Sequence, residues 1–308
     1  MSGIKILVCY HKADRFLKSD ILVPIHVGRA VASPEVKEAL DGIIGDDTGD
    51  NISSKNISFC EITAIYWAWK NRAALNNPEY VGLAHYRRLY TLNKTRNITQ
   101  KAATKDFYNH FEEEYVKNPA PLENFFRSHD IVIAHSNPSQ LGTLKSYYAQ
   151  CHIPEDIERA LNILKVRYPQ QAALADEIAS RTYFHPFNMT VMKWELFEEY
   201  CRFLFGVIFD FEKTRDLAEY DLYQRRVDGF IAERLTSIFF DIIRATRPEL
   251  KTGVLEIQER DLNKKLFTLK EINVRYVWRH PLFLFKPKFW GAVLRAFQNK
   301  LGHAKAAR

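Results

Sequence analysis

Four basic or imidazole side chains follow two short apolar segments of the chain and could bind one anion together. They are His11, Lys12, Arg87 and Arg88. Arginine forks match phosphate oxygens, and a departing diphosphate needs its developing negative charge neutralised. A nucleotide sugar, which carries a diphosphate, suits such a cluster. The structural alternative is that both arginines are ordinary strand-end residues paired with surface acids.

A second group of side chains could take up a proton. Asp228 and Glu233 lie near the start of a helix predicted over residues 225–244, and a carboxylate or histidine can serve as general base when a hydroxyl attacks. His152 is the third candidate, and it shares a helix face with Tyr148 four residues earlier. Each has a structural alternative: a helix-start charge for Asp228, a surface ion pair for Glu233, and a surface or core position for His152.

Polar residues of a turn-rich loop over residues 41–56 could contact the nucleotide. Asn51 is suited to a hydrogen bond with a ribose or base, or to capping the helix that follows. Asp46, Asp47 and Asp50 offer oxygen ligands for a divalent cation, but they lack the spacing of a calcium loop. Glycine and aspartate are also common in loops because of turn geometry. We therefore expect no metal in this loop.

A helix predicted over residues 59–71 carries two tryptophans and a lysine that could face a ligand. Trp67, Trp69 and Lys70 cannot all point inward, and an exposed tryptophan can stack on a sugar or a base. Core packing is the alternative, and it is favoured for Trp69. Asn188, within a strand predicted over residues 183–192, is a further polar candidate.

Apolar runs that alternate with amphipathic segments indicate an α/β domain, which must position these residues. The remaining strands are predicted over residues 4–10, 80–84 and 130–134, and the remaining helices over residues 94–127, 154–168, 170–180 and 194–209. Ligands of open α/β sheets bind at the carboxyl ends of the strands. His85 to Arg88 directly follow the strand over residues 80–84, so their position alone makes them candidates for a site.

Composition restricts the class of protein. The 308 residues include 44 Lys and Arg against 37 Asp and Glu, but eight basic and no acidic residues lie in 273–308, which leaves the body near neutral. Nucleic-acid binders need basic residues along their contact face, so the body does not fit that class. The 21 Phe, 15 Tyr and 5 Trp exclude disorder as the main state. Four widely spaced cysteines favour buried thiols in a reducing compartment.

The basic segment over residues 273–308 combines its charge with an apolar stripe at helical spacing. The stripe consists of Trp290, Val293, Leu294, Phe297 and Leu301. A basic amphipathic helix with aromatic residues on one face is typical of an interfacial membrane anchor. Packing of this helix against the body is the alternative. Because the N-terminus lacks the pattern of a signal peptide, we expect a cytoplasmic protein attached to the inner face of the membrane through this tail.

Six short motifs, in this order, resemble a bacterial family known as domain of unknown function 4422. They are Tyr10-His11-Lys12, Gly49-Asp50-Asn51-Ile52-Ser53, Cys60-Glu61-Ile62-Thr63, Tyr66-Trp67-Ala68-Trp69-Lys70-Asn71, His85-Tyr86-Arg87-Arg88 and Gly229-Phe230-Ile231-Ala232-Glu233-Arg234-Leu235. The resemblance covers about residues 4 to 240. It implies a glycosyltransferase of a capsule, exopolysaccharide or O-antigen gene cluster.

A looser similarity to nucleotide-sugar transferases of the GT-A fold adds a mechanism. In such enzymes a strand often ends in an Asp-x-Asp metal motif, whereas His85-Tyr86-Arg87 occupies that place here. This departure leaves the usual metal bridge to the diphosphate without an obvious ligand, so we predict transfer without a metal, with Mn²⁺ or Mg²⁺ as the alternative. Our hypothesis is that Arg87 and Arg88, helped by Lys12 or Lys70, stabilise the leaving diphosphate.

Together these observations predict a GT-A-like (Rossmann-like) α/β catalytic domain over residues 1–272 and a membrane-surface tail over residues 273–308. The resemblance implies transfer of a hexose, with galactose or galactofuranose as our guess, from a UDP-sugar to a lipid-linked or growing cell-surface polysaccharide. Predicted donor contacts are His11, Lys12, Asp50, Asn51, Lys70, His85, Arg87 and Arg88; acceptor contacts are Trp67, Tyr148 and Asn188; candidate bases are His152, Asp228 and Glu233. A noncatalytic nucleotide-binding or scaffold protein is the alternative, and no nucleic-acid partner is expected.

Overall fold

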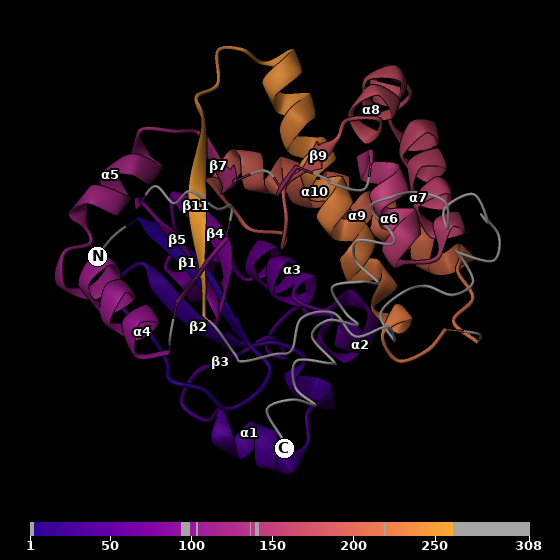
Figure 1. Ribbon diagram of the computed structural model, residues 1–308. Helices are drawn as coiled ribbons and strands as arrows, with labels where there is room; N and C mark the ends of the chain where they lie inside the picture. The colour runs from indigo at the N-terminus through magenta and orange to yellow at the C-terminus, as the bar shows by residue number, and fades with distance from the viewer. Residues whose placement is uncertain are drawn as a thin grey trace, which may run out of the picture.

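One large mixed β-sheet forms the centre of the protein (Figure 1), in a computed structural model that describes residues 3–93, 99–102, 104–135, 137–138, 142–218 and 220–260. Over these residues the sheet has nine strands, in the order β10-β7-β11-β5-β4-β1-β2-β3, with β6 paired to β11. They are β1 (Ile4–Tyr10), β2 (Leu22–His26), β3 (Ile44–Gly45), β4 (Tyr80–His85), β5 (Arg88–Thr91), β6 (Thr99–Ala102), β7 (Ile131–Ala134), β10 (Thr190–Lys193) and β11 (Thr252–Arg260). A separate small sheet pairs β8 (Asn137–Pro138) with β9 (Tyr183–Phe184).

Strands β3, β2, β1 and β4 run parallel, so their carboxyl ends meet at one edge of the sheet. All seven residues of β1 are buried, as its largely apolar sequence predicts, and they include Lys5. Cys9 lies opposite His85 in the register of β1 with β4, which brings together the residues that follow the two strands. The strands predicted over residues 4–10, 80–84 and 130–134 are confirmed as β1, β4 and β7.

Helices cover both faces of this sheet. They are α1 (Pro34–Ala39), α2 (Asn56–Phe59), α3 (Ile62–Lys70), α4 (Thr104–Glu112), α5 (Ala120–Arg127), α6 (Leu144–Cys151), α7 (Pro154–Arg167), α8 (Ala172–Ala179), α9 (Trp194–Thr214) and α10 (Val227–Thr246). Alternate side chains of β1 enter two cores: Leu7 and Cys9 pack with α3 and α7 to α10, whereas Ile6 and Val8 pack with α4 and α5. Figure 1 shows these two groups of helices on opposite sides of the strands.

Three predicted elements are interrupted in the structure. The helix expected over residues 59–71 is broken between α2 and α3, where Cys60 has a φ of 53°. The strand expected over residues 183–192 is two short strands, β9 and β10, joined by a turn. Residues 94–127, expected to be helical, include strand β6 before α4 and α5. In each case long-range packing outweighs a local pattern.

The C-terminal predictions fall outside the described residues. The proposed domain boundary after residue 272 and the tail over residues 273–308 both lie beyond Arg260, where the description of the chain stops. Among the helices that are described, none combines the length and the apolar character needed to cross a bilayer.

Candidate functional site

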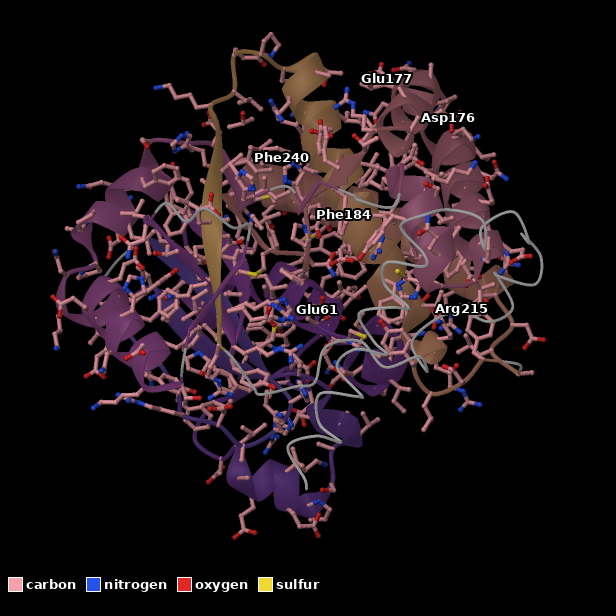
Figure 2. All side chains as sticks on the ribbon, in the orientation of Figure 1. Glu61, Asp176, Glu177, Phe184, Arg215 and Phe240 are labelled. Atoms are coloured by element: carbon pink, nitrogen blue, oxygen red, sulfur yellow. The ribbon has the colours of Figure 1, made fainter. Side chains whose placement is uncertain are left out.

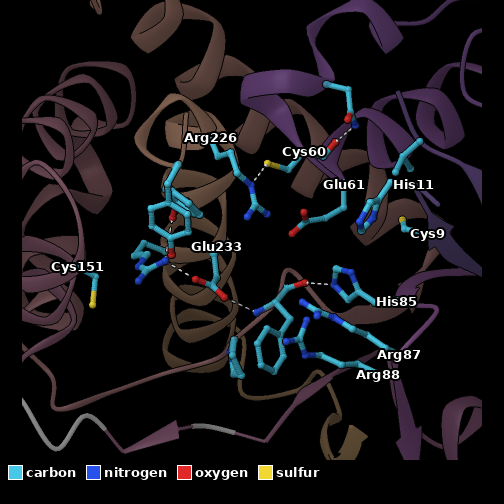
Figure 3. Close-up of a pocket in the computed structure, with 18 of the residues that line it drawn as sticks. Cys9, His11, Cys60, Glu61, His85, Arg87, Arg88, Cys151, Arg226 and Glu233 are labelled. Carbon is cyan, nitrogen blue, oxygen red and sulfur yellow. Dashed lines mark hydrogen bonds and ion pairs between the residues drawn. The ribbon is translucent and has the colours of Figure 1, made fainter. Parts of the chain in front are cut away.

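A cavity of about 740 Å³ opens where β1 and β4 end. One wall consists of the residues that follow these two strands, and the opposite wall comes from α6, α10 and the segment before α10 (Figure 3). Seven residues predicted from the sequence line it: His11, Lys12, His85, Arg87, Arg88, His152 and Glu233. The expected convergence of the residues after two parallel strands is therefore confirmed.

The two arginines of the cavity differ in how they are held. Arg88 donates from Nη2 to Oε1 of Glu259 at 2.7 Å, and its guanidinium lies 4.1 Å from the centre of the Phe187 ring. Arg87 is only partly buried, and its side chain makes no hydrogen bond or ion pair with any described residue. Arg88 is thus fixed in the wall, whereas the guanidinium of Arg87 is available to a ligand.

The histidines of the cluster are neutral at physiological pH. Burial, reinforced by Arg88, lowers the pKa of His85 to about 3, and burial together with Lys12 lowers the pKa of His11 to about 4. Nε2 of His85 lies 2.9 Å from the carbonyl oxygen of Phe187, so this nitrogen carries the hydrogen and donates it. The positive charge on this wall therefore comes from lysine and arginine.

A strained turn between β9 and β10 runs along the cavity. Phe187 and Asn188 both have left-handed backbone conformations, with φ of 73° and 54°, which residues with a side chain rarely adopt. The backbone N–H of Phe187 donates to Oε1 of Glu233 at 2.6 Å, and its carbonyl accepts from His85. The side-chain amide of Asn188 donates to Oε1 of Glu61 at 2.9 Å. Side chains that line the cavity thus hold the turn in its conformation.

Glu233 lies in the cavity wall with both carboxylate oxygens engaged. Oε1 accepts the N–H of Phe187, and Oε2 is paired with Nη1 of Arg234. Arg234 is itself buried, with its guanidinium 5.1 Å from the ring centre of Tyr148 and 5.2 Å from that of Phe184. The pair is therefore internal, which is contrary to the alternative of a surface ion pair.

Sequence reasoning missed two charged side chains, Glu61 and Arg226, that point into the cavity (Figure 3). Glu61 precedes α3, directly after the left-handed Cys60, and Arg226 donates from Nε to Sγ of Cys60 at 3.2 Å. Close packing of α10 on this break requires Gly229, since a Cβ there would lie 2.9 Å from Sγ of Cys60. The only available signal was that Glu61 falls within one of the family motifs.

Aromatic rings form most of the wall opposite Lys12, Arg87 and Arg88, and the guanidinium of Arg226 lies 5.3 Å from the ring centre of Phe230 on the same wall. The ring of His152 stacks on Phe230 at 4.0 Å and on Tyr223 at 5.9 Å, and its Nδ1 lies 3.2 Å from Oε1 of Gln224. Burial holds the pKa of His152 well below its usual range, so the ring is neutral and weakly basic. This wall offers flat apolar surface next to a charged one, an arrangement suited to a sugar ring.

Three other predicted residues lie on the loop and helix behind the cavity lining. Asp50 accepts a hydrogen bond from the hydroxyl of Tyr66 at 3.2 Å, and Asn51 accepts from the N–H of Ser53 at 3.1 Å. Lys70 is exposed at the far end of α3, about 13 Å along the helix from Glu61. Their predicted donor contacts receive no support from this geometry.

Four further predicted residues are buried and already have partners or neighbours. The indole N–H of Trp67 donates to the carbonyl of Thr48 at 3.0 Å, and Tyr148 is enclosed in the core. Asn188 supports the turn described above. Asp228 is fully buried in an ion pair with Arg215, at 2.7 Å. None of these four side chains is part of the described cavity lining.

The residues at the end of β4 are not the usual ligands of a divalent cation. A neutral His85 between cationic neighbours is a poor donor set for a divalent cation, which prefers carboxylate oxygens. Over the described residues, no three His, Cys, Asp or Glu side chains lie close enough together to hold a metal ion. Asp46, which could have been a ligand, instead accepts backbone N–H groups of Gly28 and Arg29, at 2.9 and 3.1 Å.

Comparison with known proteins gives one similar structure and one matching family. In structure the chain is similar to the WbbM bifunctional glycosyltransferase in its apo form, with a TM-score of 0.74 and 28% sequence identity; the match covers 86% of this chain and 47% of that one. The chain thus spans about half the length of that enzyme. No curated protein matches. The model of the family described as domain of unknown function 4422 matches residues 5–244. Because that match spans most of the chain, the protein belongs to this family.

Proposed function

We propose that the protein is a glycosyltransferase of the GT-A type that transfers a hexose from a nucleotide diphosphate sugar to a hydroxyl of a glycan. The parallel order β3-β2-β1-β4 followed by antiparallel β10 supports this, because it places a cavity at the carboxyl ends of β1 and β4. The likeness to a bifunctional glycosyltransferase supports the reaction class.

The observation that carries the proposal is the division of the cavity into a cationic and an aromatic wall. Lys12, Arg87 and Arg88 can neutralise a diphosphate, and the rings of Tyr223 and Phe230, each stacked on His152, face them across a space large enough for a sugar nucleotide. The donor diphosphate would lie on the first wall and the acceptor sugar against the second. We therefore assign the direct contacts with the diphosphate to Lys12, Arg87 and Arg88, and those with the acceptor sugar to Tyr223 and Phe230.

The leaving group would be stabilised by side chains, without a metal. As the bond between the anomeric carbon and the phosphate oxygen breaks, negative charge develops on the diphosphate, and a fixed cation is worth most at that moment. Arg88 is fixed by Glu259 and Phe187 in advance, and Arg87 adds a guanidinium with no competing partner among the described residues.

The finer parts of the proposal concern the substrates and the location. We propose a UDP-sugar as donor, with galactose or galactofuranose as the hexose, and a lipid-linked or growing capsule or O-antigen chain as acceptor. The backbone N–H of Arg260, the last described residue, donates to the carbonyl of Arg87 at 2.8 Å, so the described part of the chain ends close to the cavity, and the basic segment over residues 273–308 comes later in the sequence. Attachment of that segment to the inner membrane face would bring a lipid-linked acceptor to the site.

The test is a thermal-shift and turnover screen of UDP-, GDP- and dTDP-hexoses, with and without EDTA. We expect one donor class to raise the melting temperature and to release its nucleotide slowly in water, equally well in EDTA. Donor binding without any turnover would favour the noncatalytic alternative. Loss of turnover in EDTA, restored by Mn²⁺, would overturn the metal-free mechanism.

A further inference from the structure

Two carboxylates line the described part of the cavity, Glu61 and Glu233, and they are held differently. Glu233 uses both oxygens, one for the N–H of Phe187 and one for Arg234. Glu61 uses only Oε1, which accepts from Asn188 at 2.9 Å, while Oε2 has no hydrogen bond or ion pair with any described residue. A carboxylate oxygen that lines a cavity and lacks a partner is able to accept a proton from a ligand.

The position of Glu61 is set by a chain of buried hydrogen bonds. Asn188, which holds Oε1, accepts in turn from Oγ1 of Thr236 at 2.9 Å, and that hydroxyl pairs with the hydroxyl of Tyr200 at 2.7 Å. Asn188 adopts its left-handed conformation within this network. One face of the carboxylate is therefore fixed, and the other is directed toward the space between the two walls (Figure 3). Figure 2 shows Glu61 near the middle of the molecule, between the strands and the helices.

Two arginines lie near Glu61. Arg226 and Arg88 both lie within electrostatic reach of the carboxylate. Glu61 also stands at the N-cap of α3, where the helix dipole favours a negative charge. A carboxyl group that lines the cavity together with Lys12 and Arg87 meets the geometric requirement for a base that acts opposite a departing diphosphate.

We propose that Glu61 is the general base of the transfer reaction, a role that rests on the function proposed above. The acceptor oxygen forms its bond to the anomeric carbon while the bond from that carbon to the phosphate oxygen breaks. The hydroxyl proton passes to Oε2 of Glu61, and the bonding electron pair leaves with the nucleoside diphosphate toward Arg87 and Arg88. Glu233 is then a positioning residue, which acts through the turn at Phe187.

The experiment compares Glu61→Gln with Glu233→Gln and with the surface control Glu198→Gln, using the active donor of the hexose screen. Glutamine at position 61 keeps an oxygen for Asn188 but cannot take up the proton. We expect nucleotide release in water to fall about 10²- to 10⁴-fold in Glu61→Gln, while donor affinity by calorimetry stays within about threefold. Azide attacks without a proton to lose, so it should restore nucleotide release in Glu61→Gln and leave Glu233→Gln slow. Glu198, on the outer face of α9, should be without effect.

Several results would overturn the assignment. Turnover of Glu61→Gln close to that of the unaltered protein would exclude a base role, and so would weaker donor binding at unchanged turnover. Azide rescue of Glu233→Gln alone would move the base to Glu233. If the unaltered protein binds and turns over no nucleotide sugar, the proposed function itself fails, and this outcome is separate from the others.

Discussion

Replacement of Arg87 by alanine tests the cationic wall most directly, because this side chain contributes little to folding. It forms no hydrogen bond or ion pair with the described residues, and its charge helps to lower the pKa of nearby His11. Removing it should therefore change the free energy of unfolding by less than about 0.5 kcal/mol. Loss of one fixed donor to a developing anion costs about 2.7–4 kcal/mol, or 10²- to 10³-fold in kcat.

Arg88→Ala should behave differently, although the two residues are neighbours. It removes the 2.7 Å ion pair with Glu259 and the stacking on Phe187, so we expect a loss of about 1–3 kcal/mol of stability in addition to the loss of turnover. Chemical denaturation and nucleotide release, measured on the same samples, separate the two effects.

The matched control is Arg202→Ala, which removes an exposed arginine of α9 whose side chain is 65% accessible. It should alter neither stability nor turnover. Equal turnover in Arg87→Ala and Arg202→Ala would remove Arg87 from the reaction, and a large loss of stability in Arg87→Ala would show that it has a structural partner.

Three other predictions follow from single contacts. Asp46→Ala leaves buried donors, among them the hydroxyl of Thr63 at 2.6 Å, without an acceptor, so the free energy of unfolding measured in urea should fall by about 3 kcal/mol or more. The pKa of His85 is lowered to about 3 in the folded protein, so the unfolded chain binds a proton more readily and the free energy of unfolding falls as the pH drops from 6.5 toward 3. His85→Gln should reduce the slope of the free energy of unfolding against pH in this range by up to about 1.4 kcal/mol per pH unit. An unchanged slope would contradict this prediction. Deletion of residues 281–308 should release the protein from anionic liposomes in a flotation assay, and undiminished binding would contradict the anchor.

The parts of the fold that depend on local sequence could be predicted, and so could the placement of the cations. The six apolar residues of β1 indicate a buried strand wherever it pairs, and the rule that ligands bind at strand ends then selects His11 and Arg87. Strand β11 was not predicted, because its partners β5, β6 and β7 lie more than 100 residues away in the sequence. Pairing over such distances leaves no periodic signal in either segment.

Glu61 and Arg226, the two site residues that were missed, reach the cavity because α10 packs against the break between α2 and α3. Glu61 enters the cavity because the chain turns at Cys60, and a helix pattern running through residues 59–71 conceals that turn. Arg226 reaches the same space only because α10 packs closely there, at Gly229. Asp228 looks equally suitable in the sequence, yet it is buried against Arg215. Spacing along one helix cannot distinguish such neighbours.

The central position of β11 has a practical consequence for anyone who divides this protein by sequence likeness. The family match ends at residue 244, inside α10, whereas β11 begins at Thr252 and lies between β7 and β5 in the sheet. A chain cut at the family boundary would lose the partner of both strands, together with Glu259, the anchor of Arg88. Exposed strand edges of this kind promote aggregation. The smallest unit that can be expressed as an intact folded protein therefore extends at least to Arg260, beyond the end of the family match.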